Sequence, residues 1–568
     1  MKSKLKGALL AVSGSILAAA AFASTAMAEK NSDPWWKHAV FYEIYPRSFA
    51  DAKNTGMGNL AGITSKLDYL KDLGVDAIWL TPCFPSPQVD FGYDVSDYCN
   101  IDPAYGSLAD FDKLVAEAKK RKIKILMDLV MNHTSDKHAW FVESASSKTN
   151  PKRDWYIWRD AKNGGPPNNW QSIFGHSAWK FDAKTRQYYY HFFYPEQPDL
   201  NWRNPQVRKA MYDVARFWIK RGAAGYRLDA VGTLFEDPQL RDNPLIPGAK
   251  PNSYGDPAME YKFNDKLPEV HDVFKELRAV MDSLPGQPVL IGETSARSVA
   301  MLKNNYGKNH DEIQLPMNMF FAYVDKRSAS EFRKQIASAE EMSKDDWPLY
   351  FFSNHDQIRH YNRYGDGKNN DQIAKMTAAL LLTLRGSPIL YYGEELGMEN
   401  KDPARVEHVK DPIGKLGWPA FKGRDGERTP MQWTAGKNAG FSEVKSWLPV
   451  ADNYKTHNVE TESKDPNSIL NFYKALIKLR RTNDALVNGK LELIKDNNPD
   501  VLAYYRKSAS KTVLVALNMS ANAKDYKLGG KQESLELKTL LTTAGCPPKV
   551  SAGKIPLKPY SVYIAELP

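Results

Sequence analysis

Cysteine, long apolar runs and a large charge of one sign are all scarce in this chain. Three cysteines occur in 568 residues, Cys83, Cys99 and Cys546, too few for a small domain held together by disulfides. Cys83 and Cys99 are the nearest pair in sequence, but their spacing leaves open whether they pair. After residue 28 no stretch reaches the ~18 consecutive apolar residues that a membrane-spanning helix needs, so we expect no membrane span.

The charge is thinly spread and the composition is ordinary. The formal net charge of +10 comes without a cluster of basic residues interleaved with aromatic ones, so we expect no nucleic-acid partner. Hydrophobic residues make up 42% and charged residues 25% of the chain, as in typical globular proteins. A chain of 568 residues is long enough for two or three domains, one of them with a large core.

The first 28 residues have the pattern of a secretory signal peptide. Lysines at positions 2, 4 and 6 precede an apolar stretch over residues 8–23, and small residues at 26–28 offer an A-x-A cleavage site. A basic start, a short apolar stretch and small residues in this order are typical of export signals. We predict cleavage after Ala28 and an exported protein, periplasmic or secreted.

Eight short β-rich stretches alternate with helical patterns. Most are nearly continuous in apolar residues, which is typical of parallel strands buried on both faces. Amphipathic patterns such as residues 60–74 and 108–122 lie between them, and no Gly-rich nucleotide fingerprint favours an open doubly wound sheet. We therefore predict an α/β fold, a (β/α)₈ TIM barrel. The predicted strand regions are 39–49, 77–85, 123–133, 224–231, 288–294, 314–321, 349–356 and 387–396.

Two further regions interrupt or follow this pattern. About 90 residues separate the third and fourth strand regions, far more than an ordinary loop, and we predict an inserted domain over residues 134–204. The barrel is assigned residues 29–133 and 205–485. Short alternating strands come after it, which predicts a C-terminal antiparallel β-sandwich domain over residues 486–568.

Three carboxylates stand at the ends of predicted strands. Asp229, Glu293 and Asp356 end the fourth, fifth and seventh strand regions, and Arg227 lies two residues before Asp229. The carboxyl ends of barrel strands converge on one cavity, where barrel enzymes have their active sites. Each acid alone could be a structural ion-pair partner. Three at one rim, with an arginine, favour acid–base and nucleophilic chemistry.

These residues suit retaining cleavage of a glycosidic bond, which needs one carboxylate as nucleophile and one as acid/base. Arg227 would favour the ionised form of Asp229, the predicted nucleophile. Glu293 follows an apolar segment, and desolvation that raises its pKa would make it the proton donor. Asp356 would favour the oxocarbenium-like transition state.

Five ordered segments resemble the signature regions of the α-amylase family, glycoside hydrolase family 13. They are DLVMNH, QPDLN, GYRLDAVG, IGET and SNHDQ, at residues 128–133, 197–201, 225–232, 291–294 and 353–357. The similarity runs from about residue 33 to the C-terminus. It implies a catalytic barrel, an inserted domain and a C-terminal β domain. It also implies Asp229 as nucleophile, Glu293 as acid/base and Asp356 as transition-state stabiliser.

The resemblance further implies how glucose is held at subsite −1. A clamp on its 4- and 6-hydroxyls, formed by Asp94 with help from Arg424, would close the pocket, so that single glucose units leave chain ends. Tyr93 would be a stacking platform, and Phe174 is a candidate wall, with core packing as the alternative. The family pattern places three more side chains around glucose: His133, Arg227 and His355.

The QPDLN segment is similar to the form found in the oligo-1,6-glucosidase and α-glucosidase branch. That likeness implies an exo-acting α-glucosidase for short substrates, with some transglucosylation. In this branch the residue after the nucleophile is often Val in α-1,6 enzymes, and Ala or Thr in α-1,4 enzymes. Here it is Ala230, so we expect maltose-like α-glucosides and malto-oligosaccharides as substrates.

One segment departs from the family pattern. The acidic ion-binding loop D-x-N-x-D-G-x-G-D is replaced by DAKNTGMGN at residues 51–59. A hard cation needs several oxygen ligands, and Lys53 offers an ammonium instead. We expect Lys53 to pair with Asp51, no metal at this loop, and no cofactor.

Two other functions stay open at this point. The motifs are compatible with a trehalose synthase or another α-glucoside isomerase or transglucosidase, and only the product separates these from a hydrolase. A non-catalytic sugar-binding relative is disfavoured, because all three carboxylates are present. The sequence carries no signal for an oligomeric state.

Overall fold

The structure, a computed structural model, describes residues 33–342, 346–543, 545 and 547–568. The predicted signal peptide and Cys546 lie outside the described residues. Residues 38–568 form one unit, and in the short segment before it Trp35–Lys37 form a single 3-10 turn. Cys83 is buried, Cys99 is exposed, and both are free thiols.

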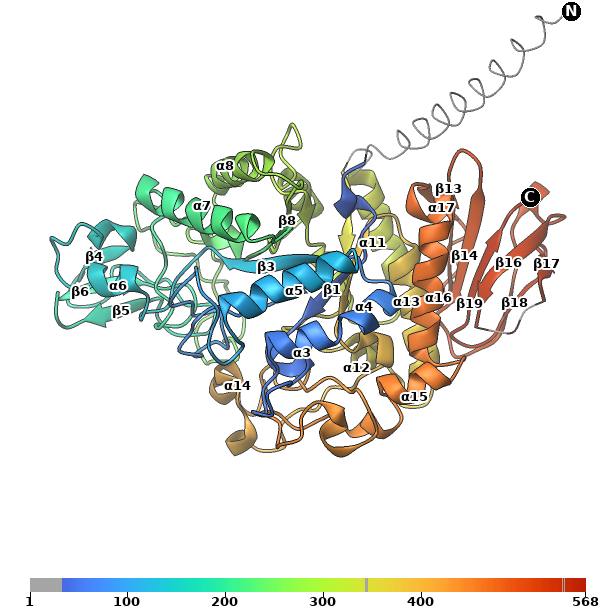
Figure 1. Cartoon of the computed structure of the whole chain (residues 1–568). Coiled ribbons are helices and arrows are strands. Elements are labelled where there is room, and N and C mark those ends of the chain that lie inside the picture. Colours follow the sequence, from blue (N-terminus) through green and yellow to red (C-terminus); the bar gives the residue numbers. More distant parts are fainter. Residues whose placement is uncertain (1–32, 343–345, 544, 546) are drawn as a thin grey trace, which may run out of the picture. The chain divides into compact units, whose positions relative to one another are not determined.

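Eight parallel strands form the barrel, one in each predicted strand region (Figure 1). A bridge between Met317 and Leu349 joins the first and last strands of the sheet and closes it. The prediction of a TIM barrel is therefore confirmed. In sheet order the strands are β10 (Leu349–Tyr350), β11 (Ser387–Tyr391), β1 (Phe41–Ile44), β2 (Ala77–Leu80), β3 (Lys124–Val130), β7 (Gly225–Asp229), β8 (Val289–Gly292) and β9 (Leu315–Pro316).

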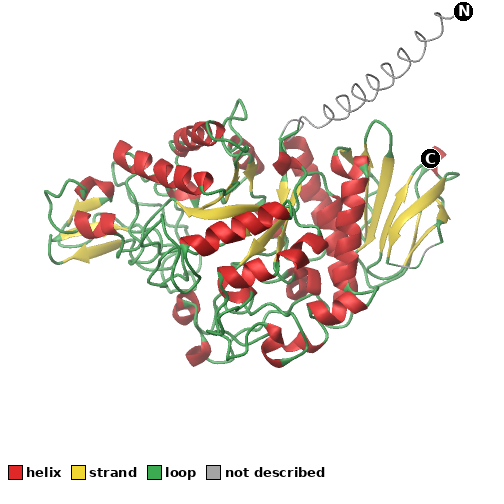
Figure 2. Ribbon diagram, in the orientation of Figure 1, coloured by secondary structure: helices red, strands yellow, loops and turns green. Residues whose placement is uncertain are grey.

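Helices cover the outside of the barrel strands (Figure 2), because each helix has an apolar face to bury. Residues 60–74, predicted as one helical pattern, form two helices, since Lys66 leaves helical geometry with φ −107° and ψ 7°. The covering helices are α3 (Leu60–Ser65), α4 (Leu67–Leu73), α5 (Leu108–Lys120), α7 (Pro205–Lys220), α8 (Val270–Asp282), α9 (Val299–Asn304), α11 (Ala329–Met342), α13 (Asn370–Thr383) and α16 (Ile469–Thr482).

The long segment between β3 and β7 folds into a small unit of its own. It contains α6 (Ala139–Ser144) and a three-stranded antiparallel sheet of β4 (Trp158–Asp160), β6 (Gln187–Tyr190) and β5 (Trp179–Asp182), in that order. An aromatic core that includes Trp170 and Trp179 supports the sheet. The Leu200 amide donates to the Asn132 carbonyl at 2.9 Å, which anchors the segment at the end of β3.

The C-terminal part is a six-stranded antiparallel sheet with a two-stranded sheet packed on one face. The other face packs on α11 and α13 of the barrel. A C-terminal antiparallel domain is thus confirmed, while its exact boundaries stay a prediction. Its strands are β12 (Lys490–Leu493), β13 (Val501–Lys507), β14 (Thr512–Asn518), β19 (Val562–Glu566), β16 (Glu536–Thr542) and β17 (Lys549–Ser551), with β15 (Lys524–Tyr526) and β18 (Ile555–Leu557) as the pair.

Candidate active site

A cavity of about 380 Å³ lies at the carboxyl ends of the barrel strands. Strand ends, the insertion and the loop after β11 all contribute to its wall. Several lining side chains were not predicted, among them Asp90, Phe193, Lys266 and Tyr323. The predicted site residues that line it are Tyr93, His133, Phe174, Asp229, Ala230, Glu293, Asp356 and Arg424.

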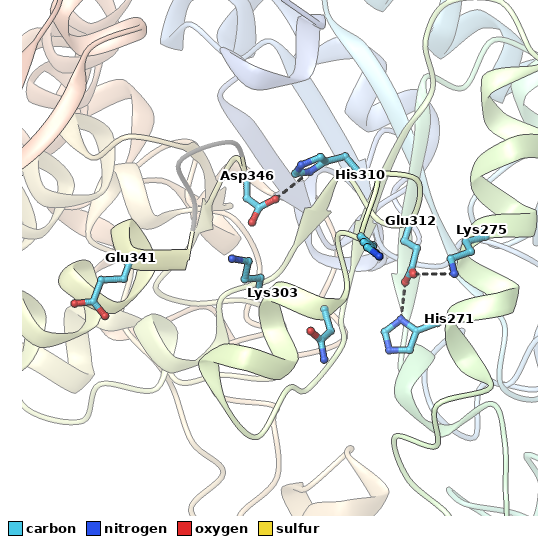
Figure 3. Close-up of a pocket in the computed structure, with 10 residues that line it drawn as sticks. His271, Lys275, Lys303, His310, Glu312, Glu341 and Asp346 are labelled. Atoms are coloured by element: carbon cyan, nitrogen blue, oxygen red, sulfur yellow. Dashed lines mark hydrogen bonds and ion pairs between the residues drawn. The ribbon is translucent and has the colours of Figure 1, made fainter.

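A larger hollow, about 840 Å³, lies beside α8 and contains none of the predicted site residues (Figure 3). His271 Nδ1 lies 2.6 Å from Glu312 Oε2, and Lys275 Nζ lies 3.8 Å from Glu312 Oε1. His310 Nδ1 lies 3.0 Å from Asp346 Oδ1. These charged groups are already paired with one another, and none of the predicted site residues lines this hollow. The smaller cavity is therefore the candidate active site.

Arg227 lies behind the cavity and binds the carboxylates that face it. Its side chain, on β7, is fully buried. Nη1 donates to Asp229 Oδ1 at 2.7 Å and to Asp128 at 3.0 and 3.1 Å, and Nη2 pairs with Glu293. The planar guanidinium can bind several carboxylates at once. Arg227 therefore holds Asp229 and Glu293 together. It is not among the cavity-lining residues, and its place around glucose stays a prediction.

Burial raises the pKa of both Asp229 and Glu293, and the charge of Arg227 opposes the shift in each. For Glu293 this is the predicted direction. For Asp229, burial is the larger effect, and Arg227 favours the ionised form, as predicted.

Asp356 has the opposite electrostatic environment. Its Oδ1 accepts from Arg428 Nη2 at 2.7 Å and from Arg424 Nη1 at 3.1 Å, and Oδ2 lies 3.3 Å from His355 Nε2. Burial alone would raise the pKa of Asp356, but the neighbouring His355, Arg424 and Arg428 outweigh it and place the pKa well below the ordinary value. This carboxylate therefore stays ionised.

The predicted clamp residue Asp94 lies behind the cavity wall. Its oxygens accept from Ser86 Oγ at 2.8 Å and from the amides of Val89 and Asp90 at 2.9 and 3.0 Å, so they hold the loop together. Asp90 instead lines the cavity, and its Oδ1 accepts from Arg424 Nη2 at 2.8 Å. The prediction is corrected: the carboxylate beside Arg424 is that of Asp90.

The two predicted histidines differ in position. His133 lines the cavity, and burial lowers its pKa to about 3, so its ring is neutral at neutral pH. His355 is fully buried and is not among the cavity-lining residues, and its place around glucose stays a prediction. It stacks on Tyr93 at 5.3 Å and 12°, and Tyr93 presents its ring to the cavity.

Ala230 follows β7 at the cavity wall, in the left-handed backbone region with φ 43° and ψ 37°. Non-glycine residues are uncommon there, and β-branched ones least favourable. This conformation ends the strand directly after Asp229. It exposes a small side chain to the cavity.

Hydrogen bonds to Asp51 hold the loop at residues 51–59 together, without the predicted ion pair between Lys53 and Asp51. Asp51 accepts from the amides of Lys53 and Gly56 at 3.0 and 2.7 Å, and from Asn59 Nδ2 and Ser442 Oγ at 3.2 and 2.7 Å. The Lys53 ammonium is not among these donors. Within the described ranges, no three His, Cys, Asp or Glu side chains are grouped to hold a metal ion.

Comparisons with known proteins agree with this site. The family model "Alpha amylase, catalytic domain" matches residues 43–489, and "Maltogenic Amylase, C-terminal domain" matches residues 491–564. The chain therefore belongs to the α-amylase family, and it is a glycosidase. In the part of the chain that the structure describes, no helix has both the length and the apolar character to cross a membrane.

Individual relatives cover nearly the whole chain. A probable alpha-glucosidase of Rhizobium meliloti is 41% identical over 88% of this chain and 92% of its own. An oligo-1,6-glucosidase of Parageobacillus thermoglucosidasius is 39% identical over 87% and 92%. The crystal structure of the alpha-glucosyl transfer enzyme XgtA superposes with a TM-score of 0.87 at 40% identity, covering 94% of this chain and all of its own.

The assignment of Asp90, and not Asp94, as the carboxylate beside Arg424 at the cavity is testable. Asp90→Asn removes a charged partner of Arg424 at the cavity, so we expect kcat/KM of the folded enzyme to fall ~10- to 100-fold. Asp94→Asn leaves buried amide donors poorly paired, so the melting temperature should fall while kcat/KM of the folded enzyme stays near wild type. Steady-state kinetics and thermal melts measure both. Equal kinetic losses in the two variants would contradict this assignment.

Proposed function

We propose that this protein is a retaining exo-α-glucosidase that releases α-glucose from the non-reducing end of short α-glucosides, with α-1,4 linkages preferred. The observation that carries the proposal is the pairing of Asp229 and Glu293 on one buried guanidinium. Retaining enzymes need their two carboxyl groups close together, since one must attack the carbon whose leaving oxygen the other protonates. The first 28 residues support export as part of this proposal.

In the first step the Asp229 carboxylate attacks C1 of the glucose unit and the bond to the aglycone oxygen breaks. Glu293 donates its proton to that oxygen, and a covalent glycosyl–enzyme forms. In the second step Glu293 takes a proton from water, whose oxygen attacks C1 and releases Asp229. Two inversions give α-glucose. The ionised Asp356 favours positive charge at the sugar ring during both steps.

The exo mode of action is supported by a charged network at one end of the cavity. Arg424 bonds to Asp90 at 2.8 Å and to Asp411 Oδ2 at 2.8 Å, and burial with opposing attraction to Arg424 leaves the pKa of Asp411 lowered to about 2. This ion-pair network is nearly fully buried. A glucose end group can bond to it, whereas a chain continuing past it would have to break it.

A transglucosidase is the second candidate. XgtA, an alpha-glucosyl transfer enzyme by name, is 40% identical and has the same fold. Transfer needs the same glycosyl–enzyme, with a sugar hydroxyl in place of water. The balance between the two acceptors depends on how well the outer part of the cavity, around Phe193, Lys266 and Tyr323, holds a sugar.

The proposed function is tested by the products of the purified protein beginning at residue 29. Maltose, isomaltose, sucrose and trehalose are incubated separately, with Asp229→Asn as the inactive control, and sugars are followed by chromatography and NMR of the anomers. We expect α-glucose from maltose and much less from isomaltose. Conversion of a disaccharide to an isomer without free glucose would replace hydrolysis with isomerisation. Full activity in Asp229→Asn would refute the mechanism.

The pH dependence follows from the raised pKa of Glu293. Glu293 must be protonated to act as the acid, so kcat/KM falls as the pH rises through its raised pKa. With an aryl α-glucoside, whose leaving group needs no proton, Glu293→Gln should lose this basic limb of the profile. Glu312→Gln, in the hollow of Figure 3, should keep it. If the fall of kcat/KM at high pH were unchanged in Glu293→Gln, another group would be the acid.

Linkage preference is tested at Ala230. We expect Ala230→Val to crowd the outer cavity and to lower the maltose/isomaltose ratio of kcat/KM by ~10- to 100-fold, the range for one or two methyl groups in a pocket. Backbone strain at φ 43° affects both substrates alike, so the ratio isolates the crowding. Ala230→Gly relieves the strain and should leave the ratio near wild type. An unchanged ratio in Ala230→Val would remove the basis for the α-1,4 preference.

A further inference from the structure

A buried glutamate lies directly behind His355. Glu43, on β1, is fully buried, and its Oε1 lies 2.7 Å from His355 Nδ1 and 3.2 Å from the His355 amide nitrogen. Its second oxygen, Oε2, is buried and has no hydrogen-bond partner among the described residues. An ionised carboxylate with one oxygen buried and unpaired is costly, whereas a neutral carbonyl oxygen in that position costs much less.

The opposite edge of the imidazole ring contacts the cavity wall. His355 Nε2 lies 2.7 Å from the Tyr93 hydroxyl and 3.3 Å from Asp356 Oδ2. Since Asp356 is ionised, a bare lone pair on Nε2 would face a negative oxygen. A proton on Nε2 turns this repulsion into attraction and gives the ring a donor for Tyr93.

The Tyr93 hydroxyl has an acceptor of its own. It lies 3.2 Å from Asp128 Oδ2, an oxygen that also accepts from Arg227 Nη1 at 3.0 Å and from Trp79 Nε1 at 3.0 Å. Asp128 is thus surrounded by donors, and the Tyr93 O–H completes the set. The Tyr93 oxygen then accepts from His355 Nε2. In this arrangement the Tyr93 oxygen accepts the Nε2 proton of His355, and Asp128 accepts the hydroxyl proton of Tyr93.

With Nε2 protonated, Nδ1 must be either a bare acceptor or a second N–H. A doubly protonated ring would be attracted by Asp356, but it would be a buried cation in the field of three arginines, Arg227, Arg424 and Arg428, beside an ionised Glu43 with one unpaired oxygen. Burial lowers the pKa of His355 well below the ordinary value, and burial raises that of Glu43 well above it. The neutral ring is therefore favoured, and Nδ1 needs a donor 2.7 Å away, where Glu43 Oε1 lies.

The geometry points to Glu43 as a neutral carboxylic acid that donates its proton to His355 Nδ1 and so holds the ring as the Nε2–H tautomer. Glu43 is then a positioning residue. Through His355 it orients Tyr93, which stacks on the ring, and one oxygen of Asp356. Its catalytic consequence rests on the proposed function, but its protonation state does not. The other titratable or charged groups that act on Glu43 or face it are Asp128, Arg227, Asp356, Tyr391 and Tyr392.

Glu43→Gln is a nearly isosteric test. The amide oxygen must accept from the His355 backbone N–H, as Glu43 Oε1 does, so no donor remains for Nδ1. The ring should switch to the Nδ1–H tautomer and turn a lone pair toward Tyr93 and Asp356. We expect kcat/KM to fall ~10-fold or more, mainly in kcat, because the ionised Asp356 loses a favourable neighbour.

The deciding measurement is ¹⁵N NMR of histidine-labelled free enzyme near neutral pH, with the His355 signals assigned by their absence in His355→Asn. We expect the neutral Nε2–H form in wild type and the neutral Nδ1–H form in Glu43→Gln. Glu395→Gln is the matched control. Glu395, in the 3-10 turn Glu394–Leu396, is equally buried but accepts from the hydroxyls of Tyr42 and Tyr69. The His355 signals should be unchanged in it.

An Nδ1–H or doubly protonated His355 in wild type would overturn the inference, and this result does not require Glu43→Gln to fold. A loss of activity in Glu43→Gln with the tautomer unchanged would also overturn the positioning role. Since the NMR measurement uses no substrate, it stands even if the enzyme proves to be an isomerase.

Discussion

The active site depends on one buried positive charge. Arg227 has no exposed surface, and its guanidinium meets the carboxylates of Asp128, Asp229 and Glu293. Taking such charges out of water costs several kcal/mol per ion unless each finds partners in good geometry. The barrel supplies these partners because the register of neighbouring strands places the carboxylates beside Arg227. Asp128 pairs with Arg227 across β3 and β7, and β8, whose end carries Glu293, lies on the other side.

A second set of charges closes the site from the loops. Arg424 and Arg428 come from the long segment after β11 and meet at Asp356, which follows β10. Arg424 also reaches Asp90 in the loop after β2. Arg424 therefore both helps to lower the pKa of Asp356 and lines one end of the cavity. In the proposed function, this single network both stabilises the sugar cation and excludes longer chains.

Much of the fold could be predicted from local patterns. The eight apolar stretches became the eight barrel strands, because parallel strands covered on both faces must be apolar along their length. Asp229 and Glu293 could be placed at one rim for the same reason, since strand ends converge in a barrel. Glu43 could not be assigned a role in this way. It lies inside an apolar strand, and only the closed barrel brings it to His355.

The sequence by itself determined the alternation of strands and helices, the C-terminal antiparallel sheet and the rim that carries the three carboxylates. These depend on the period of apolar residues, which is a local property. Tertiary structure decided which side chains reach the cavity. Asp90 and Asp94 lie four residues apart in an irregular loop, and neither period nor composition distinguishes them. Arg424, more than 300 residues away in sequence, donates to the Asp90 carboxylate, whereas the Asp94 carboxylate accepts hydrogen bonds from within its own loop.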